Sequence, residues 1–398
     1  MKDKKVNSMK YMQNKILYSI IVHMKVTGII AEYNPFHNGH IHHIKETKKL
    51  TNPDVLVCVM SGNFVQRGEP AIIDKWERAK IAVENGVDIV LELPYIYATQ
   101  SAQYFAKGSV EILKSVNIDS LVFGSESNNI EVLKDMAKLN MEDISRYTKD
   151  GLSSVKGYEQ VYGSLLSNDI LGLNYIKALK DTNINAFCIQ RTNHYHEKTM
   201  NVLHSSATSI RNAVYKNKDI STQTPMKHLN DTFKMEYYYP LIKMMLLTTP
   251  KTTLSSYFMM DEGIEGLLIK NAKSAQSYDE FLSLSVSKRY TKSRIQRTLI
   301  HMLTQTTKED VNYLPKLNYI RVLAYNEKGK DYLKQLKKQE VTIASRFNQI
   351  AEPYRSMELK AAHVYAYPLS IEEQNKWLKK ELQPPLFIST IKDNDINK

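Results

Sequence analysis

The sequence is poor in cysteine, because its 398 residues contain only Cys58 and Cys188. Two cysteines exclude a disulfide framework and leave almost no basis for a zinc site built from thiolates. Each lies within a β-branched run, so both are predicted to be small buried apolar residues rather than nucleophiles. This cysteine content is typical of a reducing compartment and predicts a cytoplasmic protein.

Long apolar runs are missing as well. The run over residues 16–24 is too short to span a bilayer, and Tyr18, Ser19 and His23 interrupt it. No small-residue cleavage site follows it, as a signal peptide would require. We therefore predict no membrane partner. Met24 directly precedes a strand pattern, so residues 1–23 are interpreted as an extension that is either disordered or not native.

Two common nucleotide-binding motifs are also absent from the sequence. No Gly-Lys-Ser/Thr follows a predicted strand, which excludes a Walker phosphate loop. Gly-x-Gly-x-x-Gly is missing too, which argues against a dinucleotide dehydrogenase. What the chain has in excess is positive charge: 54 Lys and Arg against 42 Asp and Glu give a formal net charge of +12. This excess favours a polyanionic partner.

Up to about residue 215, short β-branched runs alternate with amphipathic stretches of helical length. The runs are apolar on both faces, which is typical of parallel strands covered by helices. The alternation predicts an α/β fold with a doubly wound, Rossmann-like parallel sheet, in which ligands bind beyond the carboxyl ends of the strands. The predicted strands are Val26–Ala31, Asp54–Met60, Asp88–Leu93, Ser120–Gly124 and Asn185–Ile189.

The chain is too long for one comfortable core, and its character changes at about residue 225. Strand-like runs become rare there, and Lys, Leu, Met and Tyr recur at helical spacing. We predict two domains, an α/β domain over residues 24–220 and a mainly helical one over 225–398. A mixed segment begins near residue 350, with short strands predicted around His363–Tyr367.

A loop rich in histidine follows the first predicted strand. It reads Glu32-Tyr-Asn-Pro-Phe-His-Asn-Gly-His40, and a helix is predicted from about Ile41. The start of a helix offers free backbone N–H groups and a positive dipole to an anion. His37 and His40 share a helical face and can donate hydrogen bonds to phosphate oxygens. Two other interpretations remain open, a metal cluster with the next two histidines, or purely structural histidines.

Other polar residues are predicted at the same rim of the sheet. Ser61–Asn63, Gly124–Glu126 and Arg191 each follow a predicted strand. Arg67, next to a glycine, either forks onto a carboxylate or phosphate or is a solvated loop residue.

A helix start later in the chain is open to two interpretations. Ser206 and Thr208 are either ordinary N-caps or part of a second anion-binding helix start, with Arg211 one turn further on.

A basic run lies in the helical region and contains no acidic residue between Val286 and Arg297. Such a run is either a solvated helix face or a phosphate-binding surface for nucleic acid, on which Tyr290 can stack with an unpaired base. Arg321 and the lysines of residues 328–338 are predicted to extend this surface. The run consists of Lys288, Arg289, Lys292, Arg294 and Arg297.

These motifs occur together in a known family. His-Asn-Gly-His, residues 37–40, matches the His-x-Gly-His signature of nucleotidylyltransferases. The longer run over residues 32–40 resembles the bacterial tRNA(Met) cytidine acetate ligase family. Further similar segments follow in family order, at residues 60–71, 92–94, 123–126, 168–172, 206–211, 288–291 and 295–297.

The resemblance implies an ATP-binding domain followed by an RNA-binding domain. It implies a ligase that activates acetate with ATP and acetylates the N4 amine of the wobble cytidine of elongator tRNA(Met). Mg²⁺ is expected as the counter-ion of the ATP. No protein partner is inferred. Two alternatives stay open, a small-molecule nucleotidylyltransferase and a noncatalytic RNA-binding protein.

The resemblance also implies roles for individual residues. His37 and His40 are expected to be catalytic, and Arg67 with the five residues of the basic run is expected to bind tRNA. The expected ATP-binding residues are Ile30, Ala31, Glu32, Tyr33, Asn34, Pro35, Phe36, His37, Asn38, Gly39, His40, Ile41, His42, His43, Gly124, Asn168, Arg191, Ser206, Thr208 and Arg211.

Overall fold

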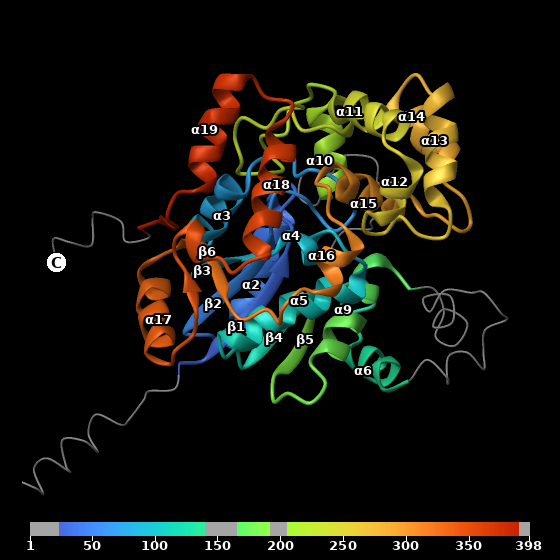
Figure 1. Cartoon of the computed structure of the whole chain (residues 1–398). Coiled ribbons are helices and arrows are strands. Elements are labelled where there is room, and N and C mark those ends of the chain that lie inside the picture. The colour runs from blue at the N-terminus through green and yellow to red at the C-terminus, as the bar shows by residue number, and fades with distance from the viewer. Residues whose placement is uncertain (1–23, 140–164, 192–204, 390–398) are drawn as a thin grey trace, which may run out of the picture.

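The computed structural model describes residues 24–139, 165–191 and 205–389, so the interpretation of residues 1–23 lies outside the described part. An eight-stranded sheet forms its centre, in the order β5-β4-β1-β2-β3-β6-β7, with β8 paired to β6 (Figure 1). The first five strands pair in parallel, which confirms the α/β class. They are β1 (Val26–Ala31), β2 (Val55–Ser61), β3 (Ile89–Leu93), β4 (Ser120–Ser125) and β5 (Asn185–Gln190).

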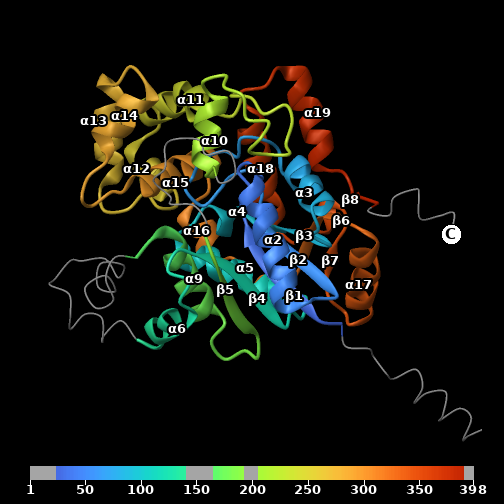
Figure 2. The ribbon, with the colours of Figure 1, turned by 180° about the vertical axis from the view of Figure 1, so that it is seen from behind.

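Helices cover both faces of this parallel part, as the doubly apolar strands require. On one face, α2 (Asn38–Thr51) and α3 (Lys75–Glu84) bury Ile44 and Trp76 against β1, β2 and β3. The opposite face carries the helices that pack through Val110 and Leu173, as the view from behind shows (Figure 2). These helices are α5 (Ala102–Ser115), α6 (Ile130–Lys138) and α9 (Ser167–Ala178).

The helical region begins with α10 (Ala207–Val214) and lies at one end of the sheet (Figure 1). Its buried residues, such as Ile242 and Leu268, belong to the same continuous apolar cluster as the sheet residues Val57 and Leu91. A short helix, α4 (Tyr95–Ala98), lies between β3 and α5. The other helices of the region are α11 (Met235–Thr248), α12 (Lys251–Ser256), α13 (Ile264–Ser274), α14 (Tyr278–Ser285), α15 (Lys292–Leu303) and α16 (Lys308–Asn312).

The C-terminal segment differs from the sequence prediction, because it returns to the sheet. β6 (Ile320–Tyr325) pairs antiparallel with β3 and then carries β7 (Ile343–Ala344) and β8 (Leu386–Phe387). The short strands predicted around His363–Tyr367 are wrong, because α18 (Tyr354–Ala366) occupies most of that range. The remaining elements are α17 (Glu327–Lys338), the 3₁₀ turn η1 (Phe347–Gln349) and α19 (Ile371–Glu381).

A buried group of charges joins this segment to the parallel strands. Lys75 Nζ lies 2.6 Å from Glu92 Oε1 and 2.7 Å from Glu381 Oε1. Arg321 Nη1 lies 2.7 Å from Glu92 Oε2 and 2.8 Å from Glu381 Oε1. All four side chains are buried, so each charge is compensated inside the protein rather than by water. The group holds α3, β3, β6 and α19 together.

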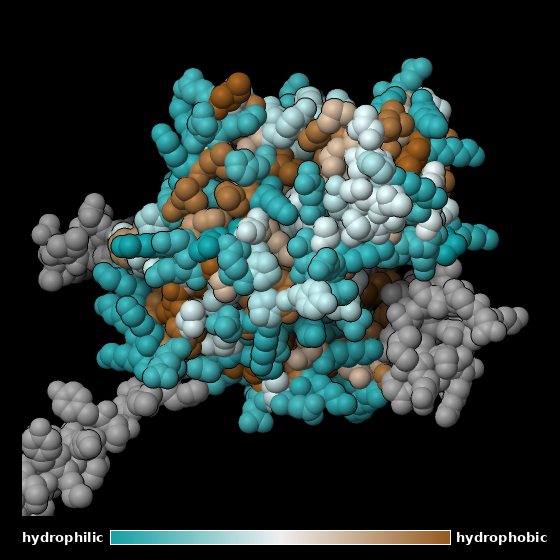
Figure 3. Space-filling view, viewed as in Figure 1, coloured by the Kyte–Doolittle hydropathy of each residue, from teal (hydrophilic) through white to brown (hydrophobic). Residues whose placement is uncertain are grey.

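Hydrophilic side chains cover much of the face seen in Figure 3, with apolar ones between them. Among the residues that the structure describes, no helix is long and apolar enough to cross a membrane. Cys58 is buried as predicted, whereas Cys188 is only partly buried because β5 is the edge strand of the sheet.

Candidate active site

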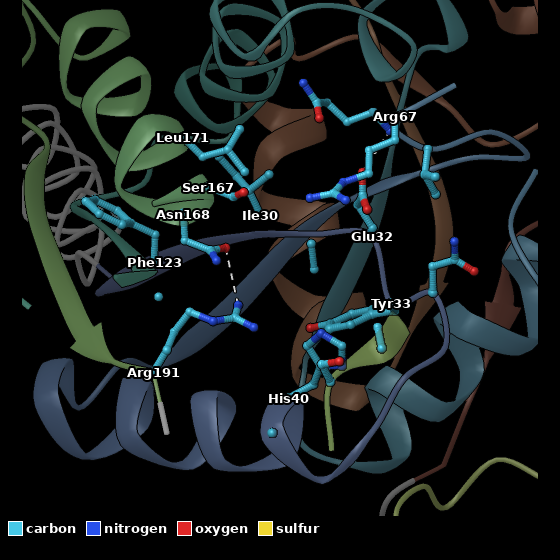
Figure 4. Close-up of a pocket in the computed structure, with 18 of the residues that line it drawn as sticks. Ile30, Glu32, Tyr33, His40, Arg67, Phe123, Ser167, Asn168, Leu171 and Arg191 are labelled. Atoms are coloured by element: carbon cyan, nitrogen blue, oxygen red, sulfur yellow. Dashed lines mark hydrogen bonds between the residues drawn. The ribbon is translucent and has the colours of Figure 1, made fainter. Parts of the chain in front are cut away.

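A cavity of about 490 Å³ opens beyond the carboxyl ends of β1, β4 and β5, where the sheet topology predicts a ligand. Figure 4 shows Arg191 and Asn168 on one side, Glu32 and Arg67 on the other, and His40 beside Tyr33. Pro35, Phe36, Asn38 and Ile41 of the predicted ATP-binding set do not line it. The predicted residues that do line it are Ile30, Ala31, Glu32, Tyr33, Asn34, His37, Gly39, His40, His42, His43, Arg67, Gly124, Asn168, Arg191, Ser206, Thr208, Arg211 and Arg297.

The histidine loop starts its helix earlier than the sequence predicts. α2 begins at Asn38 rather than near Ile41, because His37 acts as its N-cap. His37 Nδ1 accepts from the backbone N–H of Gly39 at 3.0 Å. His40 Nδ1 accepts from the backbone N–H of His37 at 3.1 Å. Two imidazoles thus form a reciprocal capping box, a task that Ser, Thr and Glu usually perform.

These two hydrogen bonds assign the ring protons. A nitrogen that accepts a hydrogen bond carries no proton, so the proton of each neutral ring is on Nε2. The ring centroids of His37 and His40 are 3.8 Å apart, and both rings line the cavity. Two adjacent Nε2–H donors are therefore presented to a ligand, from rings whose other nitrogen is anchored to the backbone.

Both rings are held in the neutral form. Burial, reinforced by the charges of Arg191 and Arg211, lowers the pKa of His37 to about 3. Burial and the neighbouring His37 lower the pKa of His40 well below its ordinary value. His43 also has its pKa lowered to about 4, by burial first and then by Arg191. An anion in the cavity would offset these positive charges and favour protonation of the rings.

The expectation that backbone N–H groups of residues 38–41 are free for phosphate is wrong. The N–H of Asn38 donates to the carbonyl of Gln223 at 3.0 Å, and those of His40 and Ile41 donate to the carbonyl of His37. With Gly39 bound to the His37 ring, all four donors are used. The capping box that orients the histidines therefore consumes the donors of this helix start.

The start of α10 is different. Ser206 caps it by accepting from the N–H of Ser209 at 3.1 Å, which confirms the capping interpretation. Within the described residues, the backbone N–H groups of Ala207 and Thr208 have no hydrogen-bond partner, and both residues line the cavity. Arg211 Nη1 reaches back to the carbonyl of Asn34 at 2.7 Å. This helix start therefore offers the free donors and the cation that an anion requires.

Asn168 and Arg191 form the opposite side of the cavity. The amide Oδ1 of Asn168 accepts from Arg191 Nη1 at 3.2 Å (Figure 4). Glu126 accepts in turn from the side-chain amide of Asn168 at 2.5 Å and from its backbone N–H. At Gly124 an added Cβ would lie 3.1 Å from Arg191 Cγ, so the glycine leaves room for the arginine to cross the strand end. Three segments that are distant in the sequence are thereby joined into one surface.

The loop after β2 supplies the remaining side. The partly buried carboxylate of Glu32 accepts from the backbone N–H of Gln66 at 2.8 Å, and its removal from water raises its pKa. Glu69 pairs with Arg211 at 3.6 Å and accepts from Gln296 at 2.9 Å. Gln66 and Glu69 were not singled out from the sequence, although they flank Arg67 in the segment that resembles the family. Ser61–Asn63, by contrast, do not line the cavity.

Arg78, which the sequence analysis did not single out, organises the rim from beneath. It is completely buried and donates to the carbonyls of Glu32 at 2.6 Å and Ser61 at 2.9 Å, and also to that of Gly62. One guanidinium thus satisfies the carbonyls that end β1 and β2. No sequence signal distinguishes this arginine from an ordinary helix residue.

The residues of the basic run lie in different places, some on the surface and one in the cavity. Lys288, Arg289 and Lys292 are exposed, and Arg294 pairs with Glu262 at 3.2 Å. Arg297 instead is buried and lines the cavity. The ring of Tyr290 is buried as well and its hydroxyl donates to the Glu262 carbonyl, so the predicted stacking on a base is wrong for this structure.

The predicted extension of the basic surface is also incorrect. Arg321 is buried in the group of charges with Glu92 and Glu381. The lysines of residues 328–338 lie on or beside α17, which both ribbon views place at the opposite side of the molecule from α15 (Figures 1 and 2).

The metal alternative for the histidine loop requires at least three ligand side chains close together. The described ranges contain no group of three or more His, Cys, Asp or Glu side chains that could hold a metal ion. His37 and His40 each use Nδ1 within the backbone cap, so only Nε2 remains available to a ligand.

A parallel sheet with paired histidines at the first strand end, facing a second helix start, defines a nucleotidyl transferase of the HIGH type. The sequence model of the HIGH Nucleotidyl Transferase family matches residues 24–381, so the chain belongs to this class. Within it, the chain belongs to the tRNA(Met) cytidine acetate ligase family. A ligase of that name from Anoxybacillus flavithermus is 37% identical over 400 residues, covering 91% of this chain and 99% of the relative.

Further relatives agree with this assignment. The tRNA(Met) cytidine acetate ligase of Caldicellulosiruptor saccharolyticus is 37% identical over 405 residues, covering 92% of this chain and 99% of its own. The apo crystal structure of Thermotoga maritima TmcAL superposes with a TM-score of 0.83 at 31% identity. The same protein bound with alpha-thio ATP gives a TM-score of 0.79. Each of these structures covers 92% of this chain and 100% of its own.

Proposed function

We propose that this protein is a cytoplasmic tRNA(Met) cytidine acetate ligase. It uses ATP to convert acetate to acetyl-adenylate with release of pyrophosphate, and then transfers the acetyl group to the N4 amine of the wobble cytidine of elongator tRNA(Met). The observation that carries the proposal is the pair of Nε2–H donors at His37 and His40, in a cavity rich in arginine, in a chain of this family. No covalent nucleophile is required, because the acetate carboxylate itself attacks the α-phosphate.

We propose a task for each side of the cavity. His37 and His40 donate to the phosphate oxygens on which charge develops, and their anchored rings need little reorganisation. Asn168, Arg191 and the strand end at Gly124 hold the nucleoside part of ATP. The free N–H groups at the start of α10, with Arg211, hold the β- and γ-phosphates.

Magnesium is proposed to enter with ATP. Mg²⁺ usually keeps several waters and is bound through substrate phosphates and only one or two carboxylates. The cavity is suited to this mode of binding, because Glu32 and Glu69 are the acidic side chains among its described lining residues. Such an ion would neutralise part of the triphosphate charge.

The tRNA is proposed to bind next to the cavity on the exposed residues Lys288, Arg289 and Lys292. Their charges can contact phosphates without reading sequence, so binding through them should weaken as salt rises. α15 begins on this surface and continues to Arg297 in the cavity, which supports a short path between the two substrates.

The deciding experiment incubates the purified chain with labelled acetate, ATP and total tRNA, and analyses the nucleosides of the recovered RNA. We expect label in N4-acetylcytidine that depends on ATP and is confined to elongator tRNA(Met). Adenylyl or cytidylyl transfer to a metabolite, without labelled RNA, would instead establish a small-molecule nucleotidylyltransferase. RNA binding with no ATP turnover would establish a noncatalytic protein.

A further inference from the structure

Four arginines line the cavity, and they differ in what neutralises them. Arg191 donates to the neutral amide of Asn168, with the carboxylate of Glu126 as the nearby negative charge, and Arg211 pairs with Glu69. Arg67 faces Glu32, and its charge offsets part of the burial that raises the pKa of that carboxyl. Arg297 has no carboxylate partner within the described residues, where its one hydrogen bond runs from Nη1 to the carbonyl of Gln66 at 3.2 Å. A buried guanidinium cation without an anionic partner lowers the stability of the protein, and a bound anion would offset this loss.

The free part of the Arg297 guanidinium has a defined shape. Its Nε is buried with no hydrogen-bond partner, and no bond is made by Nη2 among the described residues. Nε–H and Nη2 form one edge of the planar fork, the edge that binds a carboxylate through two parallel hydrogen bonds. Arg297 is only 9% exposed, so little of its guanidinium reaches the outer surface of the protein. Burial, with Arg294 nearby, lowers the pKa of Arg297 to about 10.

The surroundings of this edge favour a small organic anion over a further phosphate. Val65, Ala102 and Phe105 line the same cavity and supply apolar surface. Gln66 links them to the arginine, because its carbonyl accepts from Arg297 and its side-chain amide donates to the carbonyl of Gln100 at 3.1 Å. A phosphate would lose its hydration against such surface, whereas a carboxylate with a methyl group can use both parts of the pocket.

The position of Arg297 is held by close backbone packing. Gly68 has a φ of +76°, and a Cβ on it would lie 2.3 Å from the backbone nitrogen of Arg297. Only a glycine allows the loop after β2 to touch α15 so closely. Ser293, one turn earlier, also lines the cavity, so one face of α15 forms part of its wall.

We propose that the Nε–Nη2 edge of Arg297 binds the carboxylate of the acetate substrate. This inference rests on the proposed function and assigns the acetate site to α15 rather than to the tRNA surface. One acetate oxygen forms the bond to the α-phosphorus while the bond to pyrophosphate breaks. The other oxygen, held by Arg297, becomes the carbonyl oxygen of acetyl-adenylate. Arg297 then remains in place to stabilise negative charge on that oxygen when the cytidine amine attacks and AMP leaves.

The test measures acetate-dependent exchange of pyrophosphate into ATP with the full-length chain, at saturating ATP and varied acetate. For Arg297→Gln we expect the KM for acetate to rise at least tenfold, a loss of about 1.4 kcal/mol, with the KM for ATP changed less than twofold. Arg297→Lys keeps the charge but loses the fork, so it should give a smaller rise. Retention of tRNA on a filter should be unchanged in both variants.

The matched control is Arg355→Gln on α18, because Arg355 pairs with Glu352 and does not line the cavity. It should leave the KM for acetate unchanged. An unchanged KM for acetate in Arg297→Gln, with weaker tRNA retention or a raised KM for ATP, would overturn the inference. If Arg297→Gln does not fold, the acetate KM of Arg297→Lys decides, and an unaltered value rejects the site. Absence of acetate-dependent exchange in the unmodified protein would reject the proposed function itself.

Discussion

Arg321 and Arg297 are both buried arginines, yet they occupy opposite electrostatic situations. Arg321 contacts Glu92 and Glu381 at 2.7 and 2.8 Å, and these carboxylates raise its pKa despite burial. Among the described residues, Arg297 bonds to a backbone carbonyl alone, and burial lowers its pKa to about 10. Charges that are compensated within the chain hold elements together. A buried positive charge without a carboxylate partner in the chain indicates a site where an anionic ligand can bind.

The largest expected effect breaks the compensated group. Arg321→Met leaves the carboxylates of Glu92 and Glu381 with Lys75 as their only cation, so we expect the free energy of unfolding to fall by about 3–5 kcal/mol. Urea denaturation measures this. Lys376→Met removes an exposed partner of Glu372 and serves as the control, with no measurable change expected. A small effect of Arg321→Met would mean that the charge group does not stabilise the sheet extension.

The same measurement on Arg297→Met sharpens the contrast. Because its charge has no carboxylate partner in the described structure, removal should leave the unliganded protein as stable or make it more stable. A loss as large as that of Arg321→Met would show that the two arginines are not in different situations.

The second effect concerns catalysis alone. His40→Ala removes one Nε2–H donor from the cavity, and we expect acetate-dependent exchange to fall by about 10²–10³-fold. The protein should stay folded with a melting temperature lowered by only a few degrees, because the lost His40 ring also accepts one hydrogen bond in the cap of α2. His363→Ala, an exposed histidine on α18, is the control and should keep full activity. Full exchange in His40→Ala would remove the histidine pair from the mechanism.

The smallest effect is a pH dependence of stability, which distinguishes a histidine in the cavity from a histidine in the core. His37 in the cavity and His301 on α15 both have pKa values lowered to about 3, chiefly by burial. Their folded pKa values lie below the unfolded value of about 6.5, so the unfolded chain binds more protons as the pH falls. Stability should therefore be constant above about pH 6.5 and decrease below it, by at most about 1.4 kcal/mol per pH unit for each histidine.

A nonhydrolysable ATP analogue distinguishes the two positions. Triphosphate charge should raise the pKa of His37 and reduce its part of the acid sensitivity, whereas His301→Gln should remove the other part without ligand. Thermal unfolding from pH 4.5 to 7.5, with and without the analogue, measures both. Equal acid sensitivity with and without the analogue would show that no anion binds near the paired histidines.

Local sequence was sufficient for the parallel strands and for several helix ends. The five predicted strands match β1 to β5 to within one residue. Their continuous β-branched runs are apolar on both faces, which is typical of strands buried between two layers of helices. The position of Arg191 was predicted correctly because it directly follows a strand. That of Ser206 was predicted correctly because it begins a helix. β6 was missed, since six residues within a helical region carry no signal for the strand against which they pair.

What the sequence by itself determined is the chemistry at two strand ends and one helix start: the paired histidines after β1, the arginine after β5 and the serine that caps α10. Only the tertiary structure decided which groups remain available. The cap at His37 consumes the N–H groups of α2 while those of α10 stay free, and close packing at Gly68 turns Arg297 from a surface run into the cavity. The reason is that availability depends on partners distant in the chain, and no local pattern records them.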